Sequence, residues 1–552
     1  MDFLFAGDKS FTNAALTLIR LRANVCAGNC FFDLRNPSRF KNVYRSARRA
    51  APPNPQSFYA VPLEGSRKRT NMKTLKMSGI ALVACLALAG FANAQKWQSL
   101  KHPPTFETDS AVLLTDGRAM VHEYNSPNWW ALTPDQTGSY LNGTWKQLAS
   151  MPSDYAPLYF ASQVLPDGRV LVEGGEYNFL SQDETNLGAI YDPIKNKWTN
   201  VNPPSGWSEI GDSPSVVLPN GTLLLGQNFD TASALFNAKT LGWTIKGSGK
   251  SDAYAEEGME LLPNGKVLLV DTQNTPNSEM FNPKTNTWTT AGSTIVDLSI
   301  NAGEETGPAL LRPQGTVFAM GANGDGAAGH TAIFNTKTSK WAAGPDFPNG
   351  NDMADAPAAV LPDGNILCET SPGVFNSPVS FFEFNGSKFV TAPLPKQTGN
   401  LNTSYLGRLL VLPTGQILYT LADGATIDAE IYTAKGTFQS SWAPTITTAP
   451  SSVTRGDTYK ISGTQLHGLS HGAAYGDDAQ MNSSYALVRI TNNATKHVIY
   501  ARTHNPSTMG VATGTKIVST NFDVPKTAET GASSLVVVAN GIPSAPVNVT
   551  VQ

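Results

Sequence analysis

Cysteine is scarce in this chain of 552 residues: there are four, and Cys26, Cys30 and Cys85 all precede residue 95. Cys368 is the single cysteine beyond that point, so a chain without its first 94 residues could form no internal disulfide. Amphipathic helical patterns are also missing there, and short β-branched and leucine-rich runs stand between turn residues instead. Stability must therefore come from apolar burial in an all-β fold, for which about 450 residues are ample.

Histidine is infrequent as well, with seven in the chain. His467 and His471 are four apart but lie in a glycine-rich stretch without a helical pattern, so the pair is a weak signal for a metal site. No Gly-x-Ser-x-Gly elbow or phosphate-cradling glycine loop stands in a suitable context. The sequence therefore contains no motif that indicates a nucleophilic hydrolase or a phosphate-binding enzyme.

Residues 72–94 have the features of a secretory signal peptide. A basic segment at 72–77 precedes an apolar run at 80–91 and a small-residue cleavage site at 92–94. The apolar run is too short to span a bilayer. We expect translation to start at a methionine within the signal region. Residues 1–71 would then be a disordered upstream extension that was included in the sequence by mistake.

Basic residues are concentrated in this leader. Residues 1–94 contain 14 of the 40 Lys and Arg residues but only 4 of the 43 Asp and Glu residues. The remaining chain therefore has a formal charge of about −13 with histidine neutral. A nucleic-acid-binding tail is the alternative interpretation of the basic stretch, but a secretory signal directly follows it. An acidic secreted chain is a poor partner for nucleic acid or an anionic membrane. We expect a secreted or periplasmic monomer without a membrane span.

One four-residue turn ending in glycine recurs seven times, each time after a β-branched or leucine-rich run. Its glycines lie 44 to 53 residues apart, and a period near 50 residues is typical of kelch-type propellers. Proline presets φ at the first central position in six copies, and glycine supplies the positive φ that other residues avoid. The seven turns are Leu114–Gly117, Leu165–Gly168, Leu218–Gly221, Leu262–Gly265, Arg312–Gly315, Leu361–Gly364 and Leu412–Gly415.

Each repeat continues with two aromatic strand-like segments, such as Ala189–Pro193 followed by Lys197–Thr199. Two hairpins per repeat make a four-stranded blade, so the sequence predicts a seven-bladed kelch-type β-propeller over residues 95–442. Trp97 adds one aromatic segment more than there are turns. Either it closes the last blade from the N-terminal side, which we favour, or it packs beneath the ring.

The 50-residue period stops after residue 442. A linker rich in Pro, Thr and Ser follows at 443–452, and about seven short strand-like runs occupy 453–552. This pattern suits an immunoglobulin-like β-sandwich, in which residues 472–479 form a polar, glycine-rich loop. The expected fold is thus all-β, a propeller followed by a C-terminal sandwich.

The turns also locate candidate site residues, because the loops entering the innermost strands surround one mouth of a propeller. Nine residues before each turn glycine, the seven repeats have Thr108, Tyr159, Asp212, Glu256, Thr306, Asp355 and Leu406. With sequence neighbours added, the candidate ligand- or ion-binding residues are Tyr159, Asp212, Glu256, Glu305, Asp355 and Tyr405.

Three interpretations fit this acidic mouth. Clustered carboxylates repel one another, and Ca²⁺, which takes about six to eight oxygen ligands, would relieve the repulsion. The acids could instead bind sugar hydroxyls or an amine, with Trp129, Trp130 or Trp207 as stacking platforms. In the third interpretation the loops are solvated and the acids hold backbone amides between blades.

Residues 95–552 resemble the galactose oxidase family, which has a signal peptide, seven repeats and a C-terminal sandwich in the same order. The resemblance is carried by Leu165–Val170 and by Leu487–Arg489 followed by Thr503 and His504. Members of that family are copper radical oxidases. Their copper is held by two tyrosines and two histidines, and one tyrosine is cross-linked to a cysteine.

The resemblance puts Tyr159 and Tyr405 at the two tyrosine positions and His504 at the histidine position of the sandwich. Leu406 stands where the other histidine belongs, and Thr108 stands at the cysteine position. Because the thioether and one ligand are missing, we do not expect copper radical chemistry.

We therefore expect a secreted kelch-repeat protein that binds a carbohydrate, another polar ligand or a protein partner at the acidic mouth. Ca²⁺ is the ion considered for that mouth, and His504 the candidate metal ligand in the sandwich. The alternative is an enzyme: a galactose oxidase-like oxidoreductase with an incomplete copper site, or a hydrolase using paired carboxylates such as Asp212 and Glu256.

Overall fold

The computed structural model describes residues 95–552, apart from 304, 397–401 and 477. The predicted extension (1–71) and signal peptide (72–94) lie outside the described residues. The described elements all belong to the unit Ala92–Gln552. They are strands joined by turns and by three short 3-10 helices, of which η3 (Ser404–Leu406) lies at the site. No helix in the described ranges is long and apolar enough to cross a bilayer.

Seven antiparallel sheets each contain one of the glycine turns between their first two strands. The strands of the first three sheets are β2 (Thr108–Leu113), β3 (Ala119–Glu123), β4 (Trp129–Thr133) and β5 (Thr144–Gln147); β7 (Ala161–Val164), β8 (Val170–Glu173), β11 (Gly188–Asp192) and β12 (Lys197–Asn200); and β13 (Ser215–Val217), β14 (Leu223–Gly226), β15 (Ser233–Asn237) and β16 (Gly242–Ile245).

The remaining four sheets repeat this order along the chain. Their strands are β17 (Met259–Leu261), β18 (Val267–Val270), β19 (Ser278–Asn282) and β20 (Thr287–Thr290); β22 (Thr306–Leu311), β23 (Thr316–Asn323), β24 (Thr331–Asn335) and β25 (Lys340–Ala343); β26 (Pro357–Val360), β27 (Ile366–Thr370), β28 (Ser380–Phe384) and β29 (Phe389–Thr391); and β30 (Gly407–Val411), β31 (Ile417–Leu421) and β32 (Glu430–Thr433). Short additional strands are β6 (Pro157–Leu158), β9 (Tyr177–Asn178), β10 (Ser181–Gln182) and β21 (Ser299–Ile300).

The fourth strand of the last sheet comes from the start of the described chain. β1 (Lys96–Ser99) pairs antiparallel with β32, with Trp97 opposite Tyr432. The two rings lie 4.8 Å apart, and the indole of Trp97 donates to the carbonyl of Pro393 at 2.8 Å. Of the two places considered for Trp97, the structure thus shows closure of the last sheet.

The turn glycines have the conformation that the repeat predicts. All seven have φ between 78° and 84°, a region that residues with a Cβ avoid. At Gly117 a Cβ would also lie 2.6 Å from Cγ of Tyr500, a residue of the C-terminal sheet. Glycine is therefore required there by backbone conformation and by packing.

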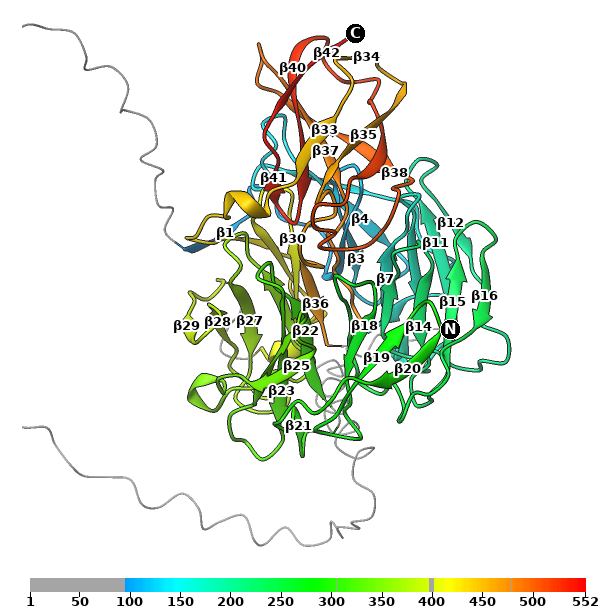
Figure 1. Ribbon diagram of the computed structural model, residues 1–552, viewed down its shortest axis with the longest axis vertical. Coiled ribbons are helices and arrows are strands. Elements are labelled where there is room, and N and C mark those ends of the chain that lie inside the picture. The colour runs from blue at the N-terminus through cyan, green and yellow to red at the C-terminus, as the bar shows by residue number, and fades with distance from the viewer. Residues whose placement is uncertain (1–94, 304, 397–401, 477) are drawn as a thin grey trace, which may run out of the picture. The chain divides into compact units, whose positions relative to one another are not determined.

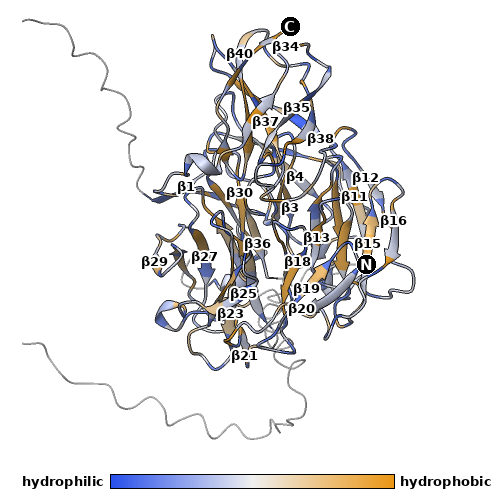
Figure 2. Ribbon diagram, viewed as in Figure 1, coloured by the Kyte–Doolittle hydropathy of each residue, from blue (hydrophilic) through white to orange (hydrophobic). Residues whose placement is uncertain are grey.

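The C-terminal strands form one sheet in the order β33-β35-β39-β38-β37-β40-β42-β34, with β41 beside β40. Figure 1 shows these strands in yellow-orange to red, and Figure 2 shows that hydrophobic residues gather on strands rather than loops. Their bounds are β33 (Thr445–Thr448), β34 (Ser452–Val453), β35 (Thr458–Thr464), β37 (Leu487–Asn492), β38 (Val498–His504), β39 (Val518–Asp523), β40 (Gly531–Ala539), β41 (Ile542–Pro543) and β42 (Val547–Val551).

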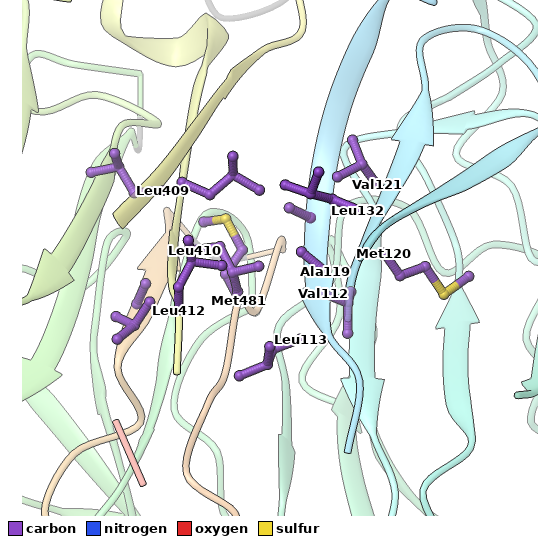
Figure 3. Close-up of a cluster of buried hydrophobic side chains, with 14 of the residues drawn as sticks. Val112, Leu113, Ala119, Met120, Val121, Leu132, Leu409, Leu410, Leu412 and Met481 are labelled. Carbon is purple, nitrogen blue, oxygen red and sulfur yellow. The ribbon is translucent and has the colours of Figure 1, made fainter. Parts of the chain in front are cut away.

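One segment between β35 and β37 leaves this sheet. Its strand β36 (Ala473–Tyr475) pairs antiparallel with β26 in the sixth sheet, with Tyr475 opposite Pro357. Figure 3 shows Met481, which follows β36, between the leucines of β30 and Val112 of β2. We call residues 470–485 the inserted segment. The sequence had suggested a loop of the sandwich here, and that placement is wrong because the segment buries its apolar side chains among the inner strands.

The C-terminal sheet meets the turn end of the inner hairpins. The amides of Asn505 and Met509 donate to the carbonyls of Pro166 (2.6 Å) and Pro219 (3.0 Å). The inner strands begin at their other end, and a six-residue strand such as β2 extends about 20 Å. The positions nine residues before the turn glycines therefore lie at the end away from these contacts, which we call the mouth end.

Candidate functional site

Three of the predicted residues come together at the mouth end. Carboxylate oxygens of Glu256, Glu305 and Asp355 lie within 4.8 Å of one another, and we call these three residues the carboxylate cluster. Glu305 and Asp355 are buried, and Glu256 is partly exposed. They directly precede the inner strands of the fourth, fifth and sixth sheets, so a loop of each of three consecutive sheets supplies one carboxylate.

The backbone adopts the same unusual conformation at this position in three repeats. Tyr159, Glu256 and Asp355 have φ of 52°, 56° and 47°. For residues with a Cβ this left-handed region costs about 1–2 kcal/mol each. Such costs persist where the surroundings enforce them, and they concentrate at functional sites.

The tip of the inserted segment rests on the carboxylate cluster. A Cβ on Gly476 would lie 3.0 Å from Oδ1 of Asp355, so the backbone approaches that carboxylate closely. The amide of Tyr475 donates to the carbonyl of Ala479 at 3.2 Å and closes the tip into a tight turn. Asp478 within this turn is completely buried.

A buried arginine lies beside the tip. The guanidinium of Arg408 in β30 is 3.8 Å from the ring centroid of Tyr475 and 5.5 Å from that of Tyr159. Its Nη1 donates to the carbonyl of Tyr405 at 2.8 Å, and Nη2 lies 4.0 Å from Oδ1 of Asp109. Sequence reasoning missed Arg408, although a charged residue inside the apolar strand Gly407–Val411 was a usable signal.

Burial controls the ionisation of the two tip residues. Desolvation raises the pKa of the Asp478 carboxyl; Arg408 opposes this and the charge of Asp355 adds to it. Desolvation also raises the pKa of the Tyr475 hydroxyl, and Asp355 raises it further. The Tyr475 hydroxyl therefore keeps its proton at neutral pH.

Asp212, Tyr405 and His504 each have another partner. Asp212 accepts a hydrogen bond from the side-chain amide of Asn228. Tyr405 lies in η3, and its ring packs on Phe375 with centroids 5.1 Å apart. His504 pairs through Nε2 with Asp523 at 3.0 Å, within the C-terminal sheet.

A second acidic group in the fourth repeat contains its own cation. The ammonium of Lys250 lies 2.6 Å from Asp252, 2.8 Å from Glu257 and 2.9 Å from Glu279, and the Lys250 side chain is fully buried. Asp271 is the remaining acid of this group, and burial, followed by the charge of Asp252, raises its pKa to about 7. We call these five residues the Lys250 cluster.

Three exposed apolar side chains lie in mouth-end loops of the second and third repeats. Phe179 and Leu180 form the turn between β9 and β10 with φ of 52° and 60°, and Phe229 has φ of 58°. They are 46%, 41% and 58% exposed. Two-residue hairpin turns with positive φ normally use Asn and Gly. Trp129 and Trp207, considered as stacking platforms, are instead buried.

A copper centre of the radical-oxidase kind does not fit these residues. Leu406 is apolar, and Cys368 is fully buried in β27 with its sulfur 3.6 Å from that of Met320. All seven histidines are described, and each bonds to a group other than Tyr159 or Tyr405. The resemblance therefore extends to the fold and not to the ligand set.

Comparison with known proteins gives matches among solved structures alone: neither a protein-family model nor a curated protein matches the sequence. A fungal alcohol oxidase of the AA5 family in complex with copper is 14% identical, with 83% of this chain and 100% of that chain covered and a TM-score of 0.48. Streptogramin B lyase is 12% identical over 61% of this chain and 97% of that chain, with a TM-score of 0.43.

The extracellular domain of BT4673 from B. thetaiotaomicron is also similar. It is 12% identical, with 82% of this chain and 58% of that chain covered and a TM-score of 0.42. Galactose oxidase-like proteins are thus among the structures that this chain resembles in fold. At these sequence identities the structural similarity says nothing about the activity or the ligand of this chain.

Proposed function

We propose that the chain is a secreted binding protein that holds a polar ligand, such as a carbohydrate, at the carboxylate cluster. In this proposal residues 95–442 form a closed seven-bladed kelch-type propeller, 443–452 a linker and 453–552 an immunoglobulin-like sandwich. Support for the ring comes from the seven sheets in chain order and from the pairing of β1 with β32.

The approach of Glu256, Glu305 and Asp355 to within 4.8 Å carries the proposal. Ionised carboxylates accept hydrogen bonds and do not donate them, so this group suits ligand hydroxyls or a cation. Two of the three acids also have left-handed backbone conformations, which are unfavourable in free energy. Such conformations concentrate at functional sites, and burial alone does not explain them.

The exposed rings around the mouth fit the same ligand class. Phe179 and Phe229, in the second and third repeats, offer exposed apolar rings of the kind that sugars stack on, while the acids of the fourth to sixth repeats would take the hydroxyls. Small-molecule sites commonly combine an apolar lining with a few placed polar groups.

Binding to a glycan array tests the proposal directly. The purified full chain should bind a defined set of glycans, and Asp355→Asn should weaken that binding by about 10-fold or more, the loss expected when a hydrogen bond to a charged group is removed. Asp154→Asn is the matched control, because Asp154 is an exposed acid in a mouth-end loop outside the cluster. An array without hits, or equal losses in both variants, would refute the proposal.

Stoichiometric copper in the purified protein, together with hydrogen peroxide production on sugar alcohols, would favour the oxidase alternative instead. That result would also require a ligand set other than the one the resemblance suggested.

A further inference from the structure

The first of the seven glycine turns differs from the other six at one position. Its second residue is Thr115, whereas each of the other turns has proline there. Proline presets φ in such a turn and lacks an N–H, so it suits this position. The backbone does not require the change: Gly117 donates to the carbonyl of Leu114 at 2.9 Å, and the second turn has the matching bond at 2.8 Å. The threonine therefore points to a role for its side chain.

Thr115 lies on the wall of a small cavity between the turns of the first two repeats and the C-terminal sheet. The cavity has a volume of about 10 Å³, and its wall includes His467, Thr503 and Met509. This is about the space that one water molecule needs. We call it the junction cavity, because the backbone amide of Thr503 donates to the carbonyl of Thr115 at 3.2 Å across the same boundary.

Two buried polar atoms of the wall have no hydrogen-bond partner among the described residues. They are Oγ1 of Thr115 and Nε2 of His467, whose residues are 5% and 1% exposed. By contrast, the hydroxyl of Thr503 on the same wall donates to the carbonyl of Ala486 at 2.6 Å. A buried polar atom without a partner is unfavourable in free energy, so the first two atoms point to a bound molecule.

The two atoms need different things from that molecule. Nδ1 of His467 lies 3.2 Å from the carbonyl oxygen of Ser484, which can only accept, so Nδ1 carries the ring proton. Burial lowers the pKa of His467 to about 4, so the ring is neutral at pH 7 and Nε2 is an acceptor. The hydroxyl of Thr115 has a hydrogen to donate. A single molecule that both donates and accepts satisfies the two.

We propose that the junction cavity binds one water molecule that joins the first repeat to the C-terminal sheet. The water donates one hydrogen to Nε2 of His467 and accepts the hydrogen of the Thr115 hydroxyl. The oxygen of the Thr503 hydroxyl can accept the second hydrogen, and buried waters typically make about three such bonds. This site is separate from the proposed ligand site, since it lies at the turn end of the inner hairpins and not at the mouth end.

A metal ion is the other occupant that an unprotonated histidine nitrogen can bind. The second histidine of the wall, His504, is already engaged: its Nε2 pairs with Asp523 at 3.0 Å, and its Nδ1 lies 3.0 Å from Nδ2 of Asn505. Beside His467 the wall then offers the thioether of Met509 and neutral hydroxyls. Zinc sites use carboxylates, thiolates or further histidines instead. Water is therefore the occupant that fits this wall.

A high-resolution crystal structure of the full chain tests the inference directly. It should show one water at about 2.5–3.2 Å from both Oγ1 of Thr115 and Nε2 of His467. Thr115→Val, which replaces the hydroxyl by a methyl group, should lose the water, and Thr115→Ser should keep it. A dry cavity in the unmodified protein, or a metal ion in it, would overturn the inference. That result needs no substitution, so it stands even if a variant does not fold.

Thermal unfolding gives a second readout. Thr115→Pro introduces the residue that the other six turns have, and a proline that fits the backbone normally raises stability by restricting the unfolded chain. Because the hydroxyl is lost, we expect Thr115→Pro and Thr115→Val to lower the melting temperature and Thr115→Ser to leave it nearly unchanged. Thr414→Val is the matched control, since Thr414 is an exposed threonine in the seventh turn. A higher melting temperature for Thr115→Pro would show that the hydroxyl has no such role.

Discussion

Replacing Lys250 by methionine should destabilise the protein strongly. The side chain is fully buried and its ammonium lies 2.6, 2.8 and 2.9 Å from Asp252, Glu257 and Glu279. Removing one partner of a buried ion pair costs about 3–5 kcal/mol, because the remaining charge is left buried and unpaired. Here three carboxylates lose the same partner, so we expect a loss of at least about 3 kcal/mol in the free energy of unfolding at pH 7.

The loss should shrink as the pH falls. Burial raises the pKa of Glu257 above its ordinary value, and Lys250 is the charge that opposes this shift. Without Lys250 the folded variant takes up a proton that the unfolded chain still releases. Its stability therefore rises as the pH falls from about 8 towards the ordinary glutamate pKa near 4.5.

Urea denaturation at pH 8 and pH 5 measures both effects. Lys250→Met with Glu257→Gln should recover part of the loss, because one unpaired charge is gone. Lys195→Met is the matched control: its partner Asp192 is 3.0 Å away, but Lys195 is 74% exposed, so the pair contributes about 0–1 kcal/mol. A loss below about 1 kcal/mol for Lys250→Met, equal at both pH values, would refute the description of a buried ion cluster.

Three further changes have defined outcomes. Asp271→Asn should raise the free energy of unfolding by about 1–3 kcal/mol at pH 8 but not at pH 4. Burial raises the pKa of Asp271 to about 7, so the buried carboxyl ionises between these pH values and the ionisation favours unfolding. Urea titrations of both proteins at pH 8 and pH 4 measure the difference. Gly476→Ala, with φ of 36° and a Cβ 3.0 Å from Oδ1 of Asp355, should displace the tip of the inserted segment and lower the melting temperature in scanning calorimetry. Gly117→Ala should lower the melting temperature more than Gly206→Ala, since both have positive φ but Gly206 has open space around it. Equal melting temperatures would refute tight packing at Gly117.

The repeat was predictable because its determinants are local. Proline and glycine set a turn over four residues, and a missing turn glycine would have broken the 50-residue period. The aromatic segments were equally informative: Tyr191 lies opposite Trp198, and Phe334 opposite Trp341, on neighbouring antiparallel strands. These pairs are the packing that the two aromatic runs of each repeat predicted.

The site was only partly predictable because its contacts are not local. Glu256 and Asp355 follow from counting back from the turn glycines, and Glu305 directly precedes the counted position Thr306. Asp212 also lies nine residues before its turn glycine, yet it accepts a hydrogen bond from Asn228 and is not one of the three clustered carboxylates. Nothing in residues 472–479 indicates that a strand there pairs with β26, more than a hundred residues earlier.

The closing sheet has a consequence for the order in which the chain can fold. β1 is made near the beginning of the described chain and β32 near the end of the repeats; Gln95 and Tyr432, whose side chains meet there, are 337 residues apart. At a synthesis rate of about 5–20 residues per second, tens of seconds separate the two strands. Until then the last sheet lacks its fourth strand and β1 has no strand to pair with. The pairing of β1 with β32 can therefore form only after the strands β2 to β31 have been made.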